Sequence, residues 1–143
     1  MKYFIGTDHA GFEVKPFVID YLQKKGIEVE DLGTYSTDSV DYPDFAHKVA
    51  EAVKNNPGTM GILICGSGIG MSLAANKHKG IRAALCHDHY TASMARRHND
   101  ANVLCFGARI VGLGEIESIL EGWLNSEFEG GRHKRRVEKI DNF

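Results

Sequence analysis

The amino-acid sequence predicts an α/β fold: a three-layer, doubly wound (Rossmann-like) sheet of five parallel strands flanked by helices, with a C-terminal helical tail. The first observation is that short apolar runs alternate with stretches whose apolar residues recur at helical spacing. The second is that the 143 residues suit a single domain and contain no internal repeat, and no linker precedes Gly130-Gly131. Parallel neighbours require crossover connections, so this alternation is typical of a doubly wound sheet.

Each expected strand is a short apolar run. The chain opens with a strand at residues 2–6. Glycines directly follow residues 61–65, the most apolar run, which is therefore expected to be a buried central strand. The other strands are expected at residues 27–29, 82–86 and 103–106.

Helices are expected after each strand. The first has apolar residues at i, i+3, i+4, i+7 and i+8 until Gly26: Val14, Phe17, Val18, Tyr21 and Leu22. Pro43 begins the second, which extends to about Asn55, because proline suits a first helical turn. The remaining helices are expected at about residues 69–78, from near Asp88, and over residues 116–124, and a basic tail covers about residues 129–143.

Composition excludes several classes of protein. A formal net charge of −2 gives no global attraction for nucleic acid, and no apolar run approaches the ~20 residues that a membrane span requires. The N-terminus shows no export signal, so we expect a cytoplasmic protein with no nucleic-acid or membrane partner. The three cysteines lack CxxC spacing, which argues against disulfides and against a zinc knuckle.

The segment Cys65-Gly66-Ser67-Gly68-Ile69-Gly70 joins the central strand to a helix, at the edge where doubly wound sheets bind ligands. Glycines there let backbone N–H groups converge on an anion, although a tight turn without a ligand is the alternative. The same N–H groups favour a thiolate, so Cys65 is a candidate base or nucleophile. Cys86 and Cys105 also end strands but lack a glycine loop, and we expect them to be small buried hydrophobes.

Polar residues near the ends of other strands and helices are candidates for the functional site, but simpler structural roles also explain them. Asp8-His9 follows the first strand and could act on a sugar hydroxyl or ring oxygen, or Asp8 could simply cap a helix. His98-Asn99-Asp100 has the composition of a solvated helix end. Arg132 and Arg136 share a helix face suited to a phosphate, or they belong to a solvated basic tail.

A metal site is not expected. His87-Asp88-His89 offers two histidines on a turn, but no further ligand follows at a recognisable spacing. Asp88 is better interpreted as the N-cap of the next helix. The sequence also predicts no cofactor.

Five motifs together resemble type B ribose-5-phosphate isomerase, in the order and spacing of that family. The resemblance extends to Arg136, and the family includes galactose-6-phosphate isomerase subunits. The motifs are Gly6-Thr7-Asp8-His9-Ala10-Gly11, Asp41-Tyr42-Pro43-Asp44, Cys65-Gly66-Ser67-Gly68-Ile69-Gly70, Ala74-Ala75-Asn76-Lys77, and His98-Asn99-Asp100-Ala101-Asn102-Val103-Leu104.

The resemblance implies a metal-free enzyme of the pentose phosphate pathway that converts ribose 5-phosphate to ribulose 5-phosphate through an enediolate. It implies that Cys65 moves the proton between C2 and C1, that the amides from Gly66 to Gly70 hold the oxyanion, and that His98, assisted by Asp8, opens the furanose ring. The remaining substrate contacts that it implies are His9, Arg109, Arg132 and Arg136 for the phosphate, Asn99 for the sugar, and Tyr42 as a lining residue.

Two positions depart from the family pattern. Ser67 stands where the cysteine-base branch usually has threonine, so the hydroxyl for proton shuttling is kept but the methyl that fixes its rotamer is lost. Met71 stands where a second branch places a glutamate base, which leaves Cys65 as the base. A hexose 6-phosphate (allose or galactose) isomerase and a non-catalytic phosphosugar-binding sensor are the alternative functions.

The expected geometry, together with the roles that the resemblance implies for Cys65 and His98 on the same sugar, predicts a shared active site. Cys65 ends a strand, whereas the helix that opens at Asp88 runs back from that edge and carries His98 about 16 Å away, at 1.5 Å per residue. A proton donor must come within about 3 Å of its target. We therefore expect a homodimer, or a dimer of dimers, in which two-fold symmetry brings His98 of one subunit to Cys65 of the other.

Overall fold

The structure, a computed structural model, describes all 143 residues and contains one sheet of five parallel strands. The strand order is β2-β1-β3-β5-β4, so the fold class expected from the sequence is confirmed. Every neighbouring pair is parallel, and the central pairing aligns Ile62 with Leu104 and Cys65 with Gly107. The strands are β1 (Lys2–Thr7), β2 (Glu28–Asp31), β3 (Met60–Cys65), β4 (Ala83–Leu85) and β5 (Val103–Gly107).

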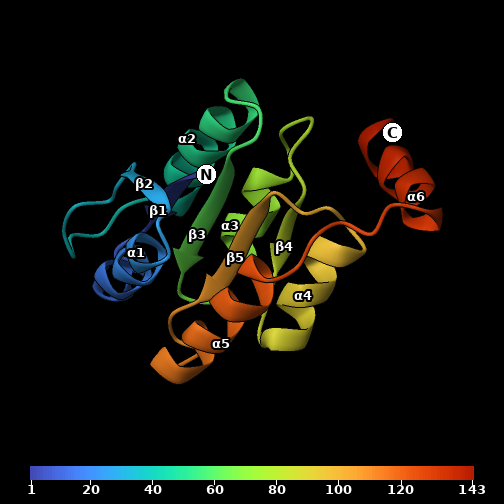
Figure 1. The fold of residues 1–143 in the computed structure, drawn as a ribbon. Coiled ribbons are helices and arrows are strands. Elements are labelled where there is room, and N and C mark those ends of the chain that lie inside the picture. Colours follow the sequence, from blue (N-terminus) through green and yellow to red (C-terminus); the bar gives the residue numbers. More distant parts are fainter.

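Helices cover both faces of this sheet and give the three layers (Figure 1). Helices α1, α4 and α5 pack on one face, α2 and α3 pack on the other, and α6 stands apart from the sheet. No helix is long and apolar enough to span a membrane. The helices are α1 (Lys15–Lys24), α2 (Tyr42–Asn55), α3 (Ile69–Ala75), α4 (His89–Arg97), α5 (Leu113–Leu124) and α6 (Arg132–Asp141), with a short 3₁₀ helix at Phe12–Val14.

Alternation along the strands distributes the core between the two faces. In β3, Ile62 and Ile64 point to the face of α1, α4 and α5, whereas Leu63 and Cys65 point to the face of α2 and α3. Trp123 of α5 is fully buried, and its indole N–H donates to the Tyr3 hydroxyl at 3.0 Å. Both faces therefore bury apolar side chains, as a parallel sheet requires.

The order in which strands are added to the sheet reverses between β1 and β3. The chain leaves β1 toward β2 on one side, and β3, β5 and β4 extend the sheet on the other side. Connections that leave neighbouring strands in opposite directions open a crevice at their carboxyl ends, which is where doubly wound folds bind ligands. Asp8 follows β1 and the glycine-rich segment follows β3, so both lie at this crevice.

Several helices differ from the expected bounds. Helix α2 starts at Tyr42 rather than Pro43, and α5 starts at Leu113 rather than residue 116. Helix α3 ends at Ala75 rather than near residue 78, because the Asn76 side chain leaves the helix and bonds the backbone N–H and C=O of Ala83. Helix α1 starts at Lys15 rather than Val14, because the 3₁₀ helix precedes it. The Asp88 N-cap is confirmed: its carboxylate accepts the Thr91 N–H at 2.7 Å, and that bond lowers the pKa of Asp88.

A buried lysine fixes the loop between β2 and α2. Lys15 Nζ donates to both carboxylate oxygens of Asp31, at 2.9 and 3.1 Å, and to the Thr34 carbonyl, and the side chain is 3% exposed. Farther along the same loop, Val40 N–H donates to His9 Nδ1 at 3.2 Å. This ion pair therefore anchors the loop that reaches the crevice.

Candidate active site

The glycine-rich segment wraps around the Cys65 thiol. Gly68 has φ of +79°, a left-handed conformation that glycine adopts without strain, and its N–H donates to Cys65 Sγ at 3.2 Å. A Cβ at Gly68 would lie 2.6 Å from the Leu85 side chain and 2.7 Å from the Phe106 backbone, so the turn packs directly on β4 and β5. Ile69 N–H donates to Ser67 Oγ at 3.2 Å. The segment thus presents a nearly buried thiol beside a hydroxyl and several backbone donors.

The turn after β1 lies beside this segment. Asp8 N–H donates to the Ile64 carbonyl at 3.2 Å, which places Asp8 next to the end of β3. Asp8 Oδ1 accepts the N–H groups of Ala10 and Gly11 at 2.9 and 3.1 Å, so this carboxylate does cap its turn. Capping occupies one oxygen, and the second oxygen has no hydrogen bond within the chain. The capping and sugar-handling interpretations of Asp8 are therefore compatible.

Two more of the expected contacts gather here. A Cβ at Gly70 would lie 2.3 Å from the Tyr42 ring, so this ring covers the start of α3. The Arg109 guanidinium lies against Gly66, with Nη1 3.4 Å from the position of a Cβ there. His9 points toward the loop before α2, through its bond to Val40 N–H. The carboxyl edge therefore brings together Asp8, His9, Tyr42, Cys65, the loop from Gly66 to Gly70, and Arg109.

The other two thiols lie in different surroundings. Burial raises the pKa of Cys86 to about 12 and raises the pKa of Cys105 well above its usual value. Cys86 is 1% exposed and Cys105 is fully buried in the sheet. Both thiols stay protonated at neutral pH, and the expectation that they are buried hydrophobes is confirmed.

The remaining expected residues lie at the opposite edge of the sheet. His98 is the C-cap of α4, and the chain then passes through Asn102, whose carbonyl accepts the N–H of Gly61 near the start of β3. His98 and Asn99 therefore sit at the amino edge, whereas Cys65 ends β3 at the carboxyl edge. Arg132 and Arg136 are exposed on α6, which packs at the amino edge through His133 and Asp141. Within one chain the two groups do not meet, which agrees with the separation predicted from the sequence.

Two further residues surround His98. The His133 ring stacks on the His98 ring, with 4.2 Å between centroids and 11° between planes. Glu129 Oε1 lies 3.7 Å from His98 Nε2 and 3.6 Å from His133 Nε2. Neither Glu129 nor His133 stands out in the sequence, where their spacing of four residues at the start of a basic helix is the only signal.

The charges around this cluster shift two pKa values. Hydrogen bonding to Arg97 is the main cause that lowers the pKa of Glu129. Burial lowers the pKa of His133, the nearby His98 adds to that shift, and Glu129 opposes it. Glu129 is therefore ionised and His133 is largely neutral at neutral pH.

The side chains of His98, Glu129 and His133 each offer a ligand atom, all within 4.8 Å of one another. Imidazole binds zinc through a lone pair in its ring plane, at about 2.0–2.1 Å. The two rings are nearly parallel and stacked, so their lone pairs lie in separate planes and do not converge on one ion. This arrangement is therefore poorly suited to holding a single metal ion.

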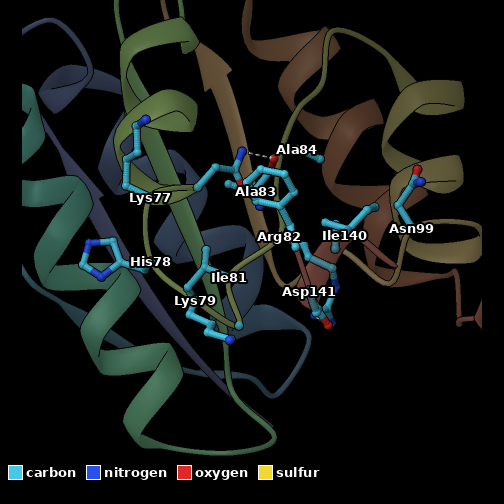
Figure 2. Close-up of a pocket in the computed structure, with 14 residues that line it drawn as sticks. Lys77, His78, Lys79, Ile81, Arg82, Ala83, Ala84, Asn99, Ile140 and Asp141 are labelled. Carbon is cyan, nitrogen blue, oxygen red and sulfur yellow. Dashed lines mark hydrogen bonds and ion pairs between the residues drawn. The ribbon is translucent and has the colours of Figure 1, made fainter. Parts of the chain in front are cut away.

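A cavity of about 620 Å³ opens at the amino edge, between α6 and the turn that joins α3 to β4 (Figure 2). Asn99 lines it, together with Ile140 and Asp141 of α6. The Arg82 guanidinium donates to both oxygens of Asp141 at 2.9 and 3.1 Å, so this pair fixes the C-terminal end of α6. The cavity is separate from the thiol and its glycine loop.

Comparisons with known proteins agree on one group of enzymes. The family model described as Ribose/Galactose Isomerase matches residues 3–140. Ribose-5-phosphate isomerase B of Escherichia coli K12 is 49% identical over 139 residues, which cover 97% of this chain and 93% of that protein. Ribose-5-P isomerase B of Listeria innocua is 47% identical over 141 residues, with 99% and 95% covered.

Solved structures give the same result. Ribose-5-phosphate isomerase B of Clostridium thermocellum superposes with a TM-score of 0.97 at 54% identity, covering 99% of this chain and 96% of that chain. The Mycoplasma genitalium enzyme, solved with bound ribulose-5-phosphate, superposes with a TM-score of 0.94 at 46% identity, with 99% and 94% covered.

Proposed function

The chain belongs to the ribose/galactose isomerase family, and on this premise we propose that it interconverts ribose 5-phosphate and ribulose 5-phosphate with Cys65 as the base. The observation that carries the assignment of the base is the contrast among three thiols. Cys65 alone stands under a loop of backbone donors at the ligand edge, whereas the other two are locked in the core. Met71 is fully buried and cannot accept a proton, so the loop offers no other base.

The proton transfers follow from this placement. The Cys65 thiolate takes the proton from C2 of the open-chain aldose, and the electron pair forms the C1–C2 double bond and moves charge onto the C1 oxygen. Backbone N–H groups from Gly66 to Gly70 stabilise that charge, and each well-placed donor contributes about 3 kcal/mol. The thiol then gives its proton to C1, while the Ser67 hydroxyl carries the proton of the C2 hydroxyl to the C1 oxygen. The product is the ketose, and Cys65 is again a thiolate.

Ring opening requires groups from a second subunit in this proposal. The homodimer places His98 and Asn99 of the partner subunit over the sugar, because neither reaches Cys65 of its own chain. The phosphate then lies between His9 and Arg109 of one subunit and Arg132 and Arg136 of the partner subunit. A dimer of dimers keeps the same arrangement.

An exposed apolar strip supports the homodimer. Ile69 and Leu73 lie one turn apart on α3 and are 52% and 64% exposed. Ile69 belongs to the glycine-rich segment and Leu73 follows one turn later, so a second copy that covers both side chains would lie beside the site. Apolar side chains at the centre of an interface are typical of homodimers.

The proposal places the enzyme in the cytoplasm, in the pentose phosphate branch of carbohydrate metabolism, without a metal or a cofactor. All the chemistry above uses side chains and backbone groups of the protein. Turnover is therefore expected to survive exhaustive chelation, and a loss that added zinc restores would overturn this part of the proposal.

The test is turnover of ribose 5-phosphate by the wild type and by Cys65→Ala. The variant should lose at least 99% of turnover, about the 10²-fold or more contributed by a positioned base, and still bind substrate in calorimetry. Cys86→Ala is the matched control because it removes a thiol from the core and should remain active. Retention of more than a few per cent of turnover by Cys65→Ala would reject the base. Parallel assays with allose 6-phosphate and galactose 6-phosphate decide between pentose and hexose substrates.

A further inference from the structure

Glu129 is fixed to the end of α4 at two points. Its backbone N–H donates to the Arg97 carbonyl at 3.0 Å. Its Oε2 accepts from Arg97 Nε, and Arg97 Nη2 lies close to the same oxygen, each at 2.7 Å. The loop between α5 and α6 is therefore held on the residue that directly precedes His98, and the carboxylate has a defined place.

The second oxygen of Glu129 faces the two stacked imidazoles. Oε1 lies 3.7 Å from His98 Nε2 and 3.6 Å from His133 Nε2. The two imidazole rings stack on each other, so both rings and the carboxylate form one small cluster. The charged and titratable groups of this cluster are Arg97 of α4, Glu129 of the loop, and Arg132, His133 and Arg136 of α6.

Glu129 is the only anion among these groups. Its carboxyl is ionised at neutral pH because Arg97 hydrogen-bonds to it. A positive charge on His98 would lie against the His133 ring, on which Arg132 and Arg136 already act, and like charges at such distances disfavour each other. An opposite charge within 4 Å of Nε2 offsets this repulsion.

We propose that Glu129 is a positioning residue for ring opening: its carboxylate holds the His98 imidazole in the orientation from which it delivers a proton to the sugar. This inference rests on the proposed function. In the step, the C1 hydroxyl loses its proton to the free oxygen of Asp8, and a C1=O bond forms. The bond from C1 to the ring oxygen breaks, and His98 gives its N–H proton to that oxygen. Glu129 itself does not touch the substrate.

Only one of the two sugar phosphates forms a ring, so ring opening can be measured separately from isomerisation. Ribose 5-phosphate closes to a furanose through its 4-hydroxyl. Ribulose 5-phosphate has its 5-hydroxyl esterified, so the C2 ketone has no hydroxyl that can form a five-membered ring. Exchange of its C1 proton with deuterated water therefore requires the Cys65 step and no ring opening.

The experiment measures both reactions in the homo-oligomeric enzyme carrying Glu129→Gln. Turnover of ribose 5-phosphate should fall about tenfold, a part of the 10²–10⁴-fold contribution of a general acid, while C1 exchange in ribulose 5-phosphate stays within about twofold of the wild type. Glu127→Gln is the matched control, because Glu127 is an exposed carboxylate of the same loop. Glu129→Asp, which keeps the charge, should recover part of the turnover.

Each possible result either supports or overturns the positioning role of Glu129. Equal losses in turnover and exchange would show a merely structural role and overturn the proposal, and so would unchanged turnover. His98→Ala should lose turnover of ribose 5-phosphate more completely than Glu129→Gln and should likewise keep the C1 exchange. If the wild type itself neither converts ribose 5-phosphate nor exchanges the C1 proton, the proposed function fails instead, independently of Glu129.

Discussion

At the level of single residues, the surroundings of the three cysteines predict that their thiols differ in reactivity. Burial raises the pKa of Cys86 to about 12 and raises the pKa of Cys105 well above its usual value. Both cysteines therefore carry almost no thiolate at neutral pH. Cys65 is 5% exposed and receives the Gly68 N–H. Iodoacetamide at pH 7.5 should therefore alkylate Cys65 alone and abolish turnover in parallel, as followed by peptide mass spectrometry. Substrate should protect the site, and comparable labelling of Cys105 would contradict the assigned environments.

Residue chemistry also decides which parts of the site could be predicted. Asp88, Cys65 and Asp8 were identifiable because each lies at or shortly after the end of a strand and its partners are near in sequence. Glu129 and His133 were not, because their importance arises from contact with His98, about thirty residues away, and only the packing of α6 creates that contact. The sequence likewise could not show that Asp8 caps its turn with one oxygen and leaves the other free.

At the level of elements, the turn between β3 and α3 should tolerate no side chain at Gly68. Gly68 and Gly26 share φ of +79°, but a Cβ at Gly26 meets no atom within 4 Å, whereas one at Gly68 lies 2.7 Å from the Phe106 backbone. Gly26→Ala should cost about 1 kcal/mol from the left-handed conformation alone. Gly68→Ala adds overpacking and should cost about 3 kcal/mol in urea unfolding. Equal losses would mean that close packing of the loop is unimportant.

Helix α6 should loosen in acid. Burial lowers the pKa of His133 in the folded chain, so below the ordinary histidine pKa of about 6.5 the unfolded chain binds more protons than the folded one. Stability contributed by His133 is therefore complete above that pH and is lost as the pH falls through the lowered value. The protection factors of the α6 amides in hydrogen exchange, which are corrected for the intrinsic pH dependence of amide exchange, should fall as the pH is lowered from 7.5 to 5.5. His133→Phe keeps a ring that can stack but does not titrate, and it should remove this dependence; a variant with the wild-type pH response would contradict the assignment.

For the molecule as a whole, the fold class followed from local patterns, but the strand order did not. Alternating strands and helices indicate a doubly wound sheet, whereas the insertion of β5 between β3 and β4 depends on how α4 and α5 pack against the face that holds Trp123. Such packing joins residues far apart in the chain and leaves no local signal. The opposite placement of Cys65 and His98 could be predicted, because helix length and direction alone determine it.

That placement gives the last prediction, which concerns the assembly. Cys65→Ala and His98→Ala should each be inactive alone, but mixed under conditions that exchange subunits they should regain about a quarter of wild-type activity. Half of the randomly paired dimers then contain both variants. Each mixed dimer has one site with Cys65 of one subunit and His98 of the partner subunit intact, and one site with neither.

A complementary mixture sharpens the test. The wild type mixed in equal parts with the double variant Cys65→Ala, His98→Ala should show about a quarter of full activity if sites are shared, because every mixed dimer then combines one intact group with one missing group at both sites. Sites within one chain would instead leave about half, since each wild-type subunit would remain active. Mass spectrometry must first confirm that subunits exchange. With exchange confirmed, an inactive first mixture and a half-active second mixture would place the whole site within one chain, and His98 would lose its role as the ring-opening acid, because in the folded chain it lies at the opposite edge of the sheet from Cys65.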